Sequence, residues 1–259
     1  MEKVYKKAVL AELKKVQELK PSLLSAADMA HLPEIVQQYL HLVGAVGKEK
    51  VVTFRAACRG RIRSAPKDAF MNIQSVQYNF YQEDPSRLFY IVAKKMGLAA
   101  KVVHIYQHQT AIMKGKLLGL FTIVDAKGEE ANQAETVTLF NDICIFAPGL
   151  LISNNIEWTV IDSLTAGARY TNGNLSIEAK LHFDADGRLI NFTSNDRYET
   201  KDGRVFHNYP WETPITEYQH FNGFNLPSKV KAIFKHPDED FCYAEFELEQ
   251  IEYNCMALK

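Results

Sequence analysis

Hydrophobic residues change their spacing near residue 50, from a helical period to a period of two. Before that point, apolar positions recur at helical spacing from Val4 to Leu19, and Pro21 is expected to end this first helix. A second helix is predicted from Leu32-Pro33-Glu34 onward, with proline in its first turn. Residues 1–48 are therefore expected to form an N-terminal helical segment.

Alternation of apolar and polar residues runs through most of the remaining chain and is typical of strands that bury one face. Turn residues such as Asp186-Gly187 and Asn222-Gly223 separate the runs, as they do in antiparallel hairpins. No repeat or linker divides them, so residues 49–259 are predicted to form a single antiparallel-sheet domain on which the helical segment packs. The strand-like runs are residues 50–63, 70–81, 88–93, 101–107, 111–124, 175–183, 189–195 and 241–253.

One amphipathic helix interrupts the strands between Glu129 and Ala147, and Pro148-Gly149 stops it. Val137, Phe140, Ile143 and other apolar residues fall on one side of this helix, and a polar group that includes Asp142 falls opposite. The predicted fold class is α+β: a large curled antiparallel β-sheet, or half-barrel, with this helix on its concave face.

Two of the predicted strands carry complementary charges. The basic residues are Arg55, Arg59, Arg61 and Arg63, and the acidic residues are Glu245, Glu247 and Glu249. Opposite charges on neighbouring strands stabilise a sheet, so we expect these two strands to lie close together with their charged faces on the same side. A solvated face and a binding site for phosphate or an anionic lipid are the alternatives.

Composition narrows the range of partners. The 259 residues carry a formal net charge of −1, so no overall field attracts nucleic acid, and no nucleic-acid partner is expected. Apolar runs are too short to cross a bilayer and the N-terminus has no apolar signal segment, so a cytoplasmic location is expected, with membrane association left open.

No cofactor or metal is predicted, because nucleotide motifs are absent and His104 and His108 are too far apart on one strand to share a metal ion.

The richest collection of functional side chains lies between Asp196 and Tyr218. A guanidinium can hold an anionic group through two hydrogen bonds, while tryptophan and tyrosine can cover an apolar chain. Neighbouring strand residues point to opposite faces, so Arg197 is expected to face the cavity of the sheet and Asp196 to anchor a loop. The alternative is a buried ion pair between Arg197 and a carboxylate such as that of Asp142. The predicted ligand-binding residues are Arg197, Trp211, Tyr218, Asp142 and Asp196.

Several sequence blocks together resemble an uncharacterised bacterial family, a domain of unknown function. These blocks are Leu32-Pro33-Glu34-Ile35-Val36-Gln37-Gln38-Tyr39-Leu40, Leu139-Phe140-Asn141-Asp142-Ile143-Cys144-Ile145-Phe146-Ala147-Pro148, Trp158, Asp196-Arg197-Tyr198, Tyr209-Pro210-Trp211-Glu212-Thr213-Pro214, Tyr218, Gly223 and Pro227. The resemblance implies no activity. The order of elements is also similar to that of the lipoprotein-carrier fold, in which a curled antiparallel sheet holds a helix in its concave face.

A curled sheet closed by an amphipathic helix encloses an apolar cavity, and such cavities are common ligand sites. The leading hypothesis is therefore a protein that binds an apolar or amphipathic, lipid-like molecule between the sheet and the helix at residues 129–147. A hydrolase-type enzyme that uses Asp142, Asp196 or His207 as acid or base is the first alternative. A structural or partner-binding module is the second, and the oligomeric state is left open.

Overall fold

The protein is described by a computed structural model that covers residues 1–16, 22–95 and 97–259. The helices are α1 (Glu2–Leu13), α2 (Ala26–Met29), α3 (Glu34–Leu42) and α4 (Glu129–Phe146), and a 3₁₀ helix, η1 (Pro148–Ile152), follows α4. The expected first helix is confirmed as α1, whereas Leu19 and Pro21 lie outside the described residues. In this part of the chain, no helix combines the length and the hydrophobicity needed to cross a membrane.

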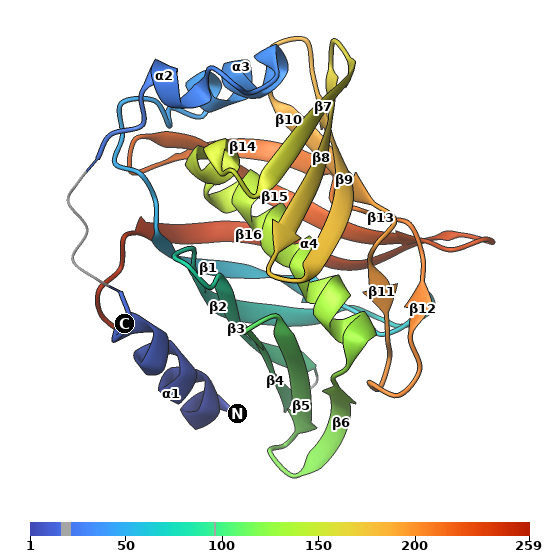
Figure 1. Cartoon of the computed structure of the whole chain (residues 1–259). Coiled ribbons are helices and arrows are strands. Elements are labelled where there is room, and N and C mark those ends of the chain that lie inside the picture. The colour runs from blue at the N-terminus through green and yellow to red at the C-terminus, as the bar shows by residue number, and fades with distance from the viewer. Residues whose placement is uncertain (17–21, 96) are drawn as a thin grey trace.

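Fourteen strands form one antiparallel sheet that curls around α4 (Figure 1). They are β1 (Thr53–Ile62), β2 (Met71–Phe80), β3 (Ser86–Lys95), β4 (Leu98–Gln107), β5 (Thr110–Leu117), β6 (Phe121–Ala126), β7 (Ile156–Asp162), β8 (Thr165–Asn172), β9 (Leu175–Phe183), β10 (Leu189–Ser194), β13 (Trp211–Glu212), β14 (Ile215–Phe221), β15 (Phe224–Lys235) and β16 (Asp240–Tyr253). Two further strands, β11 (Tyr198–Glu199) and β12 (His207–Asn208), pair only with each other. The predicted antiparallel sheet is thus confirmed.

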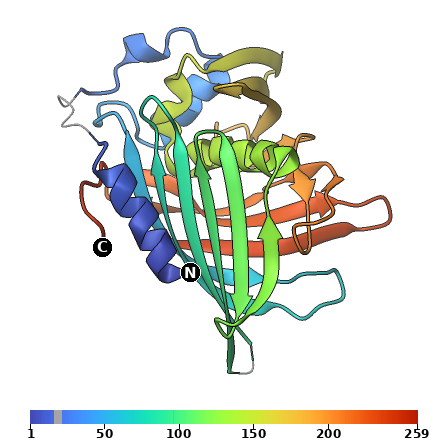
Figure 2. The same cartoon turned by 60° about the horizontal axis from the view of Figure 1, so that its bottom comes forward.

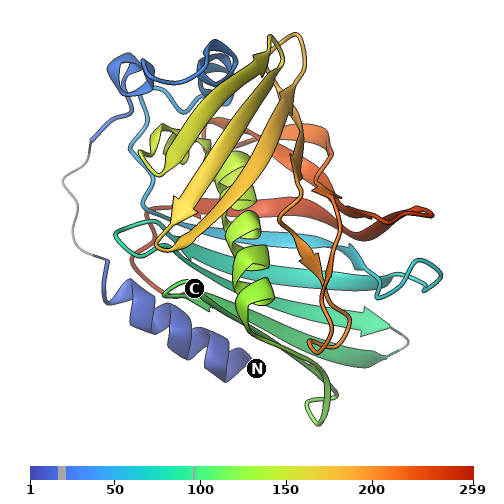
Figure 3. The same ribbon diagram turned by 45° about the vertical axis from the view of Figure 1, so that its right-hand side comes forward.

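The strand order leaves the sheet open. It runs β6-β5-β4-β3-β2-β1-β16-β15-β13-β10-β9-β8-β7, with β14 paired to β15, so β6 and β7 are the two edges. Helix α4 lies across the concave face, and α1 packs on the opposite, convex face (Figures 2 and 3). The ring of Tyr5 in α1 stacks on that of Tyr90 in β3, with 5.5 Å between centroids. The division of the chain at residue 48 stays a prediction.

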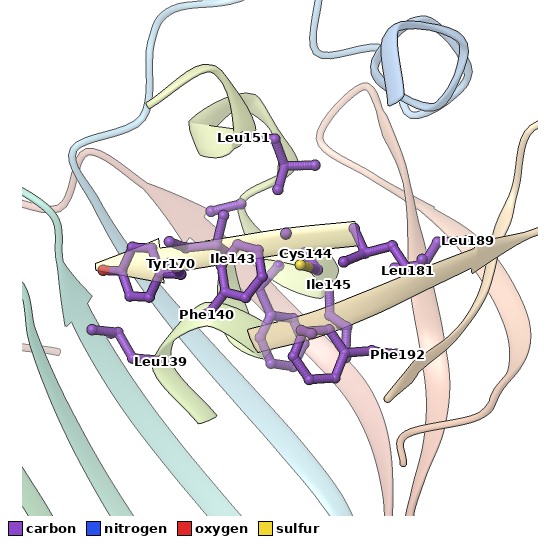
Figure 4. Packing of buried hydrophobic residues seen from close by; sticks show 14 of the residues in the cluster. Leu139, Phe140, Ile143, Cys144, Ile145, Leu151, Tyr170, Leu181, Leu189 and Phe192 are labelled. Carbon is purple, nitrogen blue, oxygen red and sulfur yellow. The ribbon is translucent and has the colours of Figure 1, made fainter. Parts of the chain in front are cut away.

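The apolar side of α4 packs against the β8–β10 end of the curled sheet (Figure 4). The ring of Phe140 stacks on Tyr170 at a centroid distance of 5.0 Å and meets the edge of Phe192 at 5.7 Å. Burial of each such aromatic side chain contributes about 1.5–3 kcal/mol. One helical turn further along α4, the Tyr39 hydroxyl of α3 donates a 2.8 Å hydrogen bond to the carbonyl of Cys144. The polar side of α4 is buried as well, and it faces the opposite wall of the sheet.

The charged strands are neighbours, as their sequence predicted. Strand β1 pairs with β16, which places Arg59 opposite Glu247 and Arg61 opposite Glu245. Each arginine forms two hydrogen bonds to the facing carboxylate, the shortest of 2.7 Å in both pairs. Arg55 is the third paired residue of the row, 3.5 Å from Glu252.

The run at residues 111–124, which was expected to form one strand, is a hairpin. Leu118 and Gly119 both have positive φ angles, of 53° and 76°, and they turn the chain between β5 and β6. Two successive residues with positive φ make the tight turn whose twist matches that of the flanking strands. The hydrophobic residues on either side of Gly119 hid this turn from the periodicity of the sequence.

Charge reversal tests the contribution of the ion pairs on the convex face. Glu247→Arg should lower the free energy of unfolding modestly, because it places like charges opposite Arg59 and beside Lys229. Adding Arg59→Glu should recover part of that loss, which can be measured by urea denaturation of the four proteins in the cycle. Strictly additive effects would show that the two side chains do not interact.

Candidate functional site

An apolar cavity of about 360 Å³ lies between the concave face of the sheet and the polar side of α4. Strands β1–β6 form one wall, β15 and β16 continue it, and the connection between β10 and β13 closes one side. The apolar lining includes Ile62, Phe89, Ile91, Val102, Met113, Val124, Phe234 and Phe246. A larger and more open depression of about 670 Å³ covers the convex face, but it lies over the arginine–glutamate pairs described above. The apolar cavity is therefore the candidate site.

A buried network of charges holds α4 against this wall. Arg87 of β3 donates a 2.7 Å hydrogen bond to Asp142 and a 3.0 Å hydrogen bond to Glu135, and both carboxylates project from α4. Asp142 also accepts hydrogen bonds from the side-chain amides of Gln77 and Asn79 in β2, at 3.1 and 3.0 Å. Glu135 and Asp142 are seven residues apart, two helical turns, so both lie on the side of α4 that faces the sheet.

The two carboxylates of the network differ in their protonation behaviour. Burial alone would raise the pKa of Glu135, but the charges of Arg87 and His104 outweigh it and hold the pKa below its ordinary value. The Nδ1 atom of His104 lies 2.9 Å from Glu135. At Asp142, burial dominates and raises the pKa, although Arg87 and the two amides oppose this shift. Both carboxylates are therefore already hydrogen-bonded to other side chains of the protein.

Arg197 lines the cavity and forms no salt bridge with a carboxylate among the described residues. Its guanidinium carbon lies 5.5 Å from the ring centroid of Trp211, and one terminal nitrogen donates a 3.1 Å hydrogen bond to the carbonyl of Tyr198. Its buried Nε atom makes no hydrogen bond. The Trp211 indole donates to the hydroxyl of Tyr243 at 3.2 Å, and both rings line the cavity beside Arg197. An unsatisfied guanidinium nitrogen beside two aromatic rings is suited to an anionic group at the end of an apolar molecule.

The segment between β10 and β13 is fastened across one side of the cavity (Figure 3). Glu199 of β11 lies 2.7 Å from Nε2 of His236, just beyond β15. At the far end of the segment, the backbone N–H of Asp125 in β6 donates to the carbonyl of Asp202 at 3.1 Å. Gly203, with φ of 86°, allows this close approach, because a Cβ at this position would collide with the Asp125 carbonyl.

The structure brings together three of the five predicted ligand-binding residues. Arg197, Trp211 and Asp142 line the cavity, although Asp142 is engaged by Arg87. Asp196 accepts a 2.7 Å hydrogen bond from the backbone of β9, so it anchors its loop as expected. Both Asp196 and Arg197 lie in the connection between β10 and β11, outside a regular strand.

Tyr218 does not join the predicted cluster. It belongs to β14, which pairs only with β15, and its side chain turns toward α3. Its hydroxyl donates a 2.7 Å hydrogen bond to the carbonyl of Leu189, and its ring is not part of the cavity lining. The predicted convergence is therefore wrong for Tyr218, because sequence spacing does not reveal on which side of the curled sheet β14 lies.

The residues of the hydrolase alternative lie in three different surroundings. Asp142 is buried beside Arg87, Asp196 is bonded to the backbone of β9, and His207 is exposed on β12, where it stacks on Tyr209. Within the described ranges, no hydrogen bond joins any two of these three side chains. No cluster of histidine, cysteine and acidic residues suited to a metal ion occurs in the same part of the chain.

Sequence reasoning missed Arg87, Glu135 and His104 as parts of the site. The available signal was Arg87 itself, a charge that directly precedes the apolar run Leu88 to Ala93 in the same strand. A charge at a buried strand position requires a partner. The carboxylates on one side of the predicted helix were candidates for that partner.

Loss of Arg87 should be strongly destabilising. Arg87→Met leaves Glu135 and Asp142 buried without their cation, which costs on the order of 3–5 kcal/mol. Glu135→Gln should cost less, because Arg87 keeps Asp142 as a partner. Thermal and urea unfolding measure both effects, and equal stability of the Arg87→Met variant and the unaltered protein would contradict the role given to this network.

No curated protein matches the chain in sequence. Among solved structures, a domain assigned to outer-membrane lipoprotein sorting from Vibrio parahaemolyticus has 10% identity and a TM-score of 0.48, covering 85% of this chain and 91% of that one. A DUF1329 family protein from Desulfovibrio piger has 10% identity and a TM-score of 0.46 over 90% and 94% of the two chains. A LolA superfamily protein from Nitrosomonas europaea has 6% identity and a TM-score of 0.43 over 85% and 92%.

These likenesses are loose and concern the overall fold. The sequence itself gives a firmer relation, because the profile of a family of unknown function, DUF6544, matches residues 22–246. That range includes the whole of α4, most of the sheet and every residue of the cavity lining. The chain therefore belongs to the DUF6544 family.

Proposed function

We propose that the protein binds a single-chain amphipathic molecule with an anionic head group in the cavity between α4 and the concave face of the sheet. The observation that carries this proposal is the guanidinium of Arg197, which lines the cavity without a salt bridge to any described carboxylate and has a buried Nε with no hydrogen-bond partner. Trp211 and Tyr243 would cover the part of the ligand next to its head group. The cytoplasmic location expected from the sequence stays a prediction.

The volume of the cavity limits the size of the ligand. The volume of this cavity is about 360 Å³. This is the lower end of the range of small-molecule pockets, about 300–1,000 Å³. A carboxylate with a chain of medium length is compatible with this volume.

The charges around the cavity favour an anion. Arg87 is paired with Glu135 and Asp142, so its guanidinium is not free to bind a ligand. Arg197 is within electrostatic reach of Glu135, yet forms no salt bridge with it or with another described carboxylate. A bound carboxylate would satisfy the Nε atom of Arg197 and complete its fork of donors.

Arg197→Met should remove the preference for an anionic ligand without unfolding the protein. We expect decanoate binding to weaken by roughly ten- to a hundredfold, because hydrogen bonds to charged groups contribute about 1.5–3 kcal/mol. Binding of decanol, which has the same chain but no charge, should change little. Isothermal titration calorimetry with both ligands, together with thermal unfolding, provides the measurement.

Arg63→Met is the matched control. Arg63 also lines the cavity, but its Nε donates to the carbonyl of Cys242 at 2.8 Å, so it has no free donor at that atom. This variant should keep the preference for decanoate over decanol. If the Arg197→Met protein were strongly destabilised but bound decanoate as before, Arg197 would have a structural role and the proposal would be refuted.

A further inference from the structure

The hairpin between β5 and β6 ends in an exposed apolar tip. Leu120 is 75% exposed and Phe121 is 64% exposed, and Leu118 in the turn is exposed as well. Leu98, at the start of β4, is another exposed apolar residue at this end of the sheet, where the backbone N–H of Leu118 donates to the carbonyl of Ala99. Figure 2 shows the turn of this hairpin at the lower end of the strands β3–β6. Large apolar side chains gathered on a protruding turn are typical of an interaction surface.

The tip is continuous with the proposed ligand cavity. Strand β6 contains a bulge, since Val124 pairs with Gly115 and Thr122 with Lys116, which leaves Ile123 as the extra residue. Ile123 is exposed to solvent and also lines the cavity. Leu117, which pairs with Phe121, packs on the apolar cluster of the cavity wall. Apolar surface thus extends from the interior of the cavity to the tip.

The charge of this part of the sheet is positive. No aspartate or glutamate occurs between Asp84 and Asp125, a stretch that contains β3, β4, β5 and most of β6. Lys101 and Lys116 lie opposite each other on β4 and β5, and Lys94 is nearby on β3. These three ammonium groups form no salt bridge with any described residue, whereas Lys114 reaches Asp125 at 4.0 Å. Lys101 is within electrostatic reach of Glu2 in α1, but Lys94 and Lys116 lie beside the apolar tip without a salt bridge and complement an anionic lipid surface.

We propose that the apolar tip at residues 118–121 inserts into an anionic lipid surface, from which the ligand passes along the concave face of β4–β6 into the cavity. This inference rests on the proposed function and names the source of the ligand. The lysines provide the attraction to the surface, and the apolar residues provide the insertion. Asp202 and Gly203 cover edge strand β6 at Asp125, so insertion involves the end of the hairpin beyond this contact.

A second apolar hairpin in the same chain provides a matched control. Val160, 67% exposed, and Ile161 lie near the turn between β7 and β8. The next residue, Asp162, ends β7, and neither strand contributes to the cavity lining. This hairpin therefore has the exposed apolar residues but lacks both the lysines and the connection to the cavity.

Vesicle flotation tests the proposal, with phosphatidylcholine vesicles that contain or lack phosphatidylglycerol. The unaltered protein should float with the anionic vesicles, and added salt should weaken this binding. Leu120→Ser with Phe121→Ser should reduce binding about tenfold or more, because two large apolar groups no longer enter the lipid. Val160→Ser with Ile161→Ser should leave binding unchanged.

Calorimetry with decanoate separates this inference from the proposed function. The Leu120→Ser, Phe121→Ser variant should bind decanoate from solution normally, and the Arg197→Met variant should still bind anionic vesicles. No binding of the unaltered protein to anionic vesicles, or an equal loss in the Val160, Ile161 variant, would overturn the docking site. The docking site would also be overturned if the protein formed a dimer in the absence of vesicles and the tip substitutions dissociated it. That result would show that a second copy of the chain covers the tip.

Discussion

The buried contact of Arg87 with Asp142 and Glu135 is the interaction on which the rest of the structure depends. It joins β3 to two residues of α4 that are two helical turns apart, while the apolar side of the same helix packs on β8–β10. One flank of α4 is therefore held by hydrophobic burial and the other by charge. The ion pairs fix the position of the polar side of α4 relative to β3. The apolar side chains of the surrounding strands leave a space beside this side of the helix.

The cavity follows from this arrangement. If both sides of α4 packed on the sheet through apolar contacts, the side chains would fill the space between them, because apolar protein interiors are closely packed. Here the charged network spaces α4 from strands β3–β6, and the segment that contains Arg197 is tied across the side by Glu199 and Asp202. The result is a largely apolar space lined by the guanidinium of Arg197, whose Nε has no hydrogen-bond partner, and this matches an anionic amphiphile as the proposed ligand.

The sequence predicted the helices and strands better than the long-range contacts between them. The bounds of α4 and the pairing of the arginine and glutamate strands follow from periodicity and charge that are local or repeated. Arg197 lies outside a regular strand, so the alternation of strand residues does not explain its position in the cavity. Arg87 and its partners are 48 and 55 residues apart in the chain, so their contact depends on how the sheet curls, which periodicity does not encode. The same limit explains Tyr218, whose strand lies beyond the region that lines the cavity.

The central claim is that the cavity holds an anionic amphiphile through Arg197. A crystal structure of the complex with decanoate tests it most directly. The account predicts that the carboxylate lies within hydrogen-bonding distance of Nε of Arg197, and that the chain extends between α4 and the apolar side chains of β3 and β4. A decanoate bound on the outer surface, or one whose carboxylate contacts solvent while Arg197 keeps its unpartnered Nε, would contradict it.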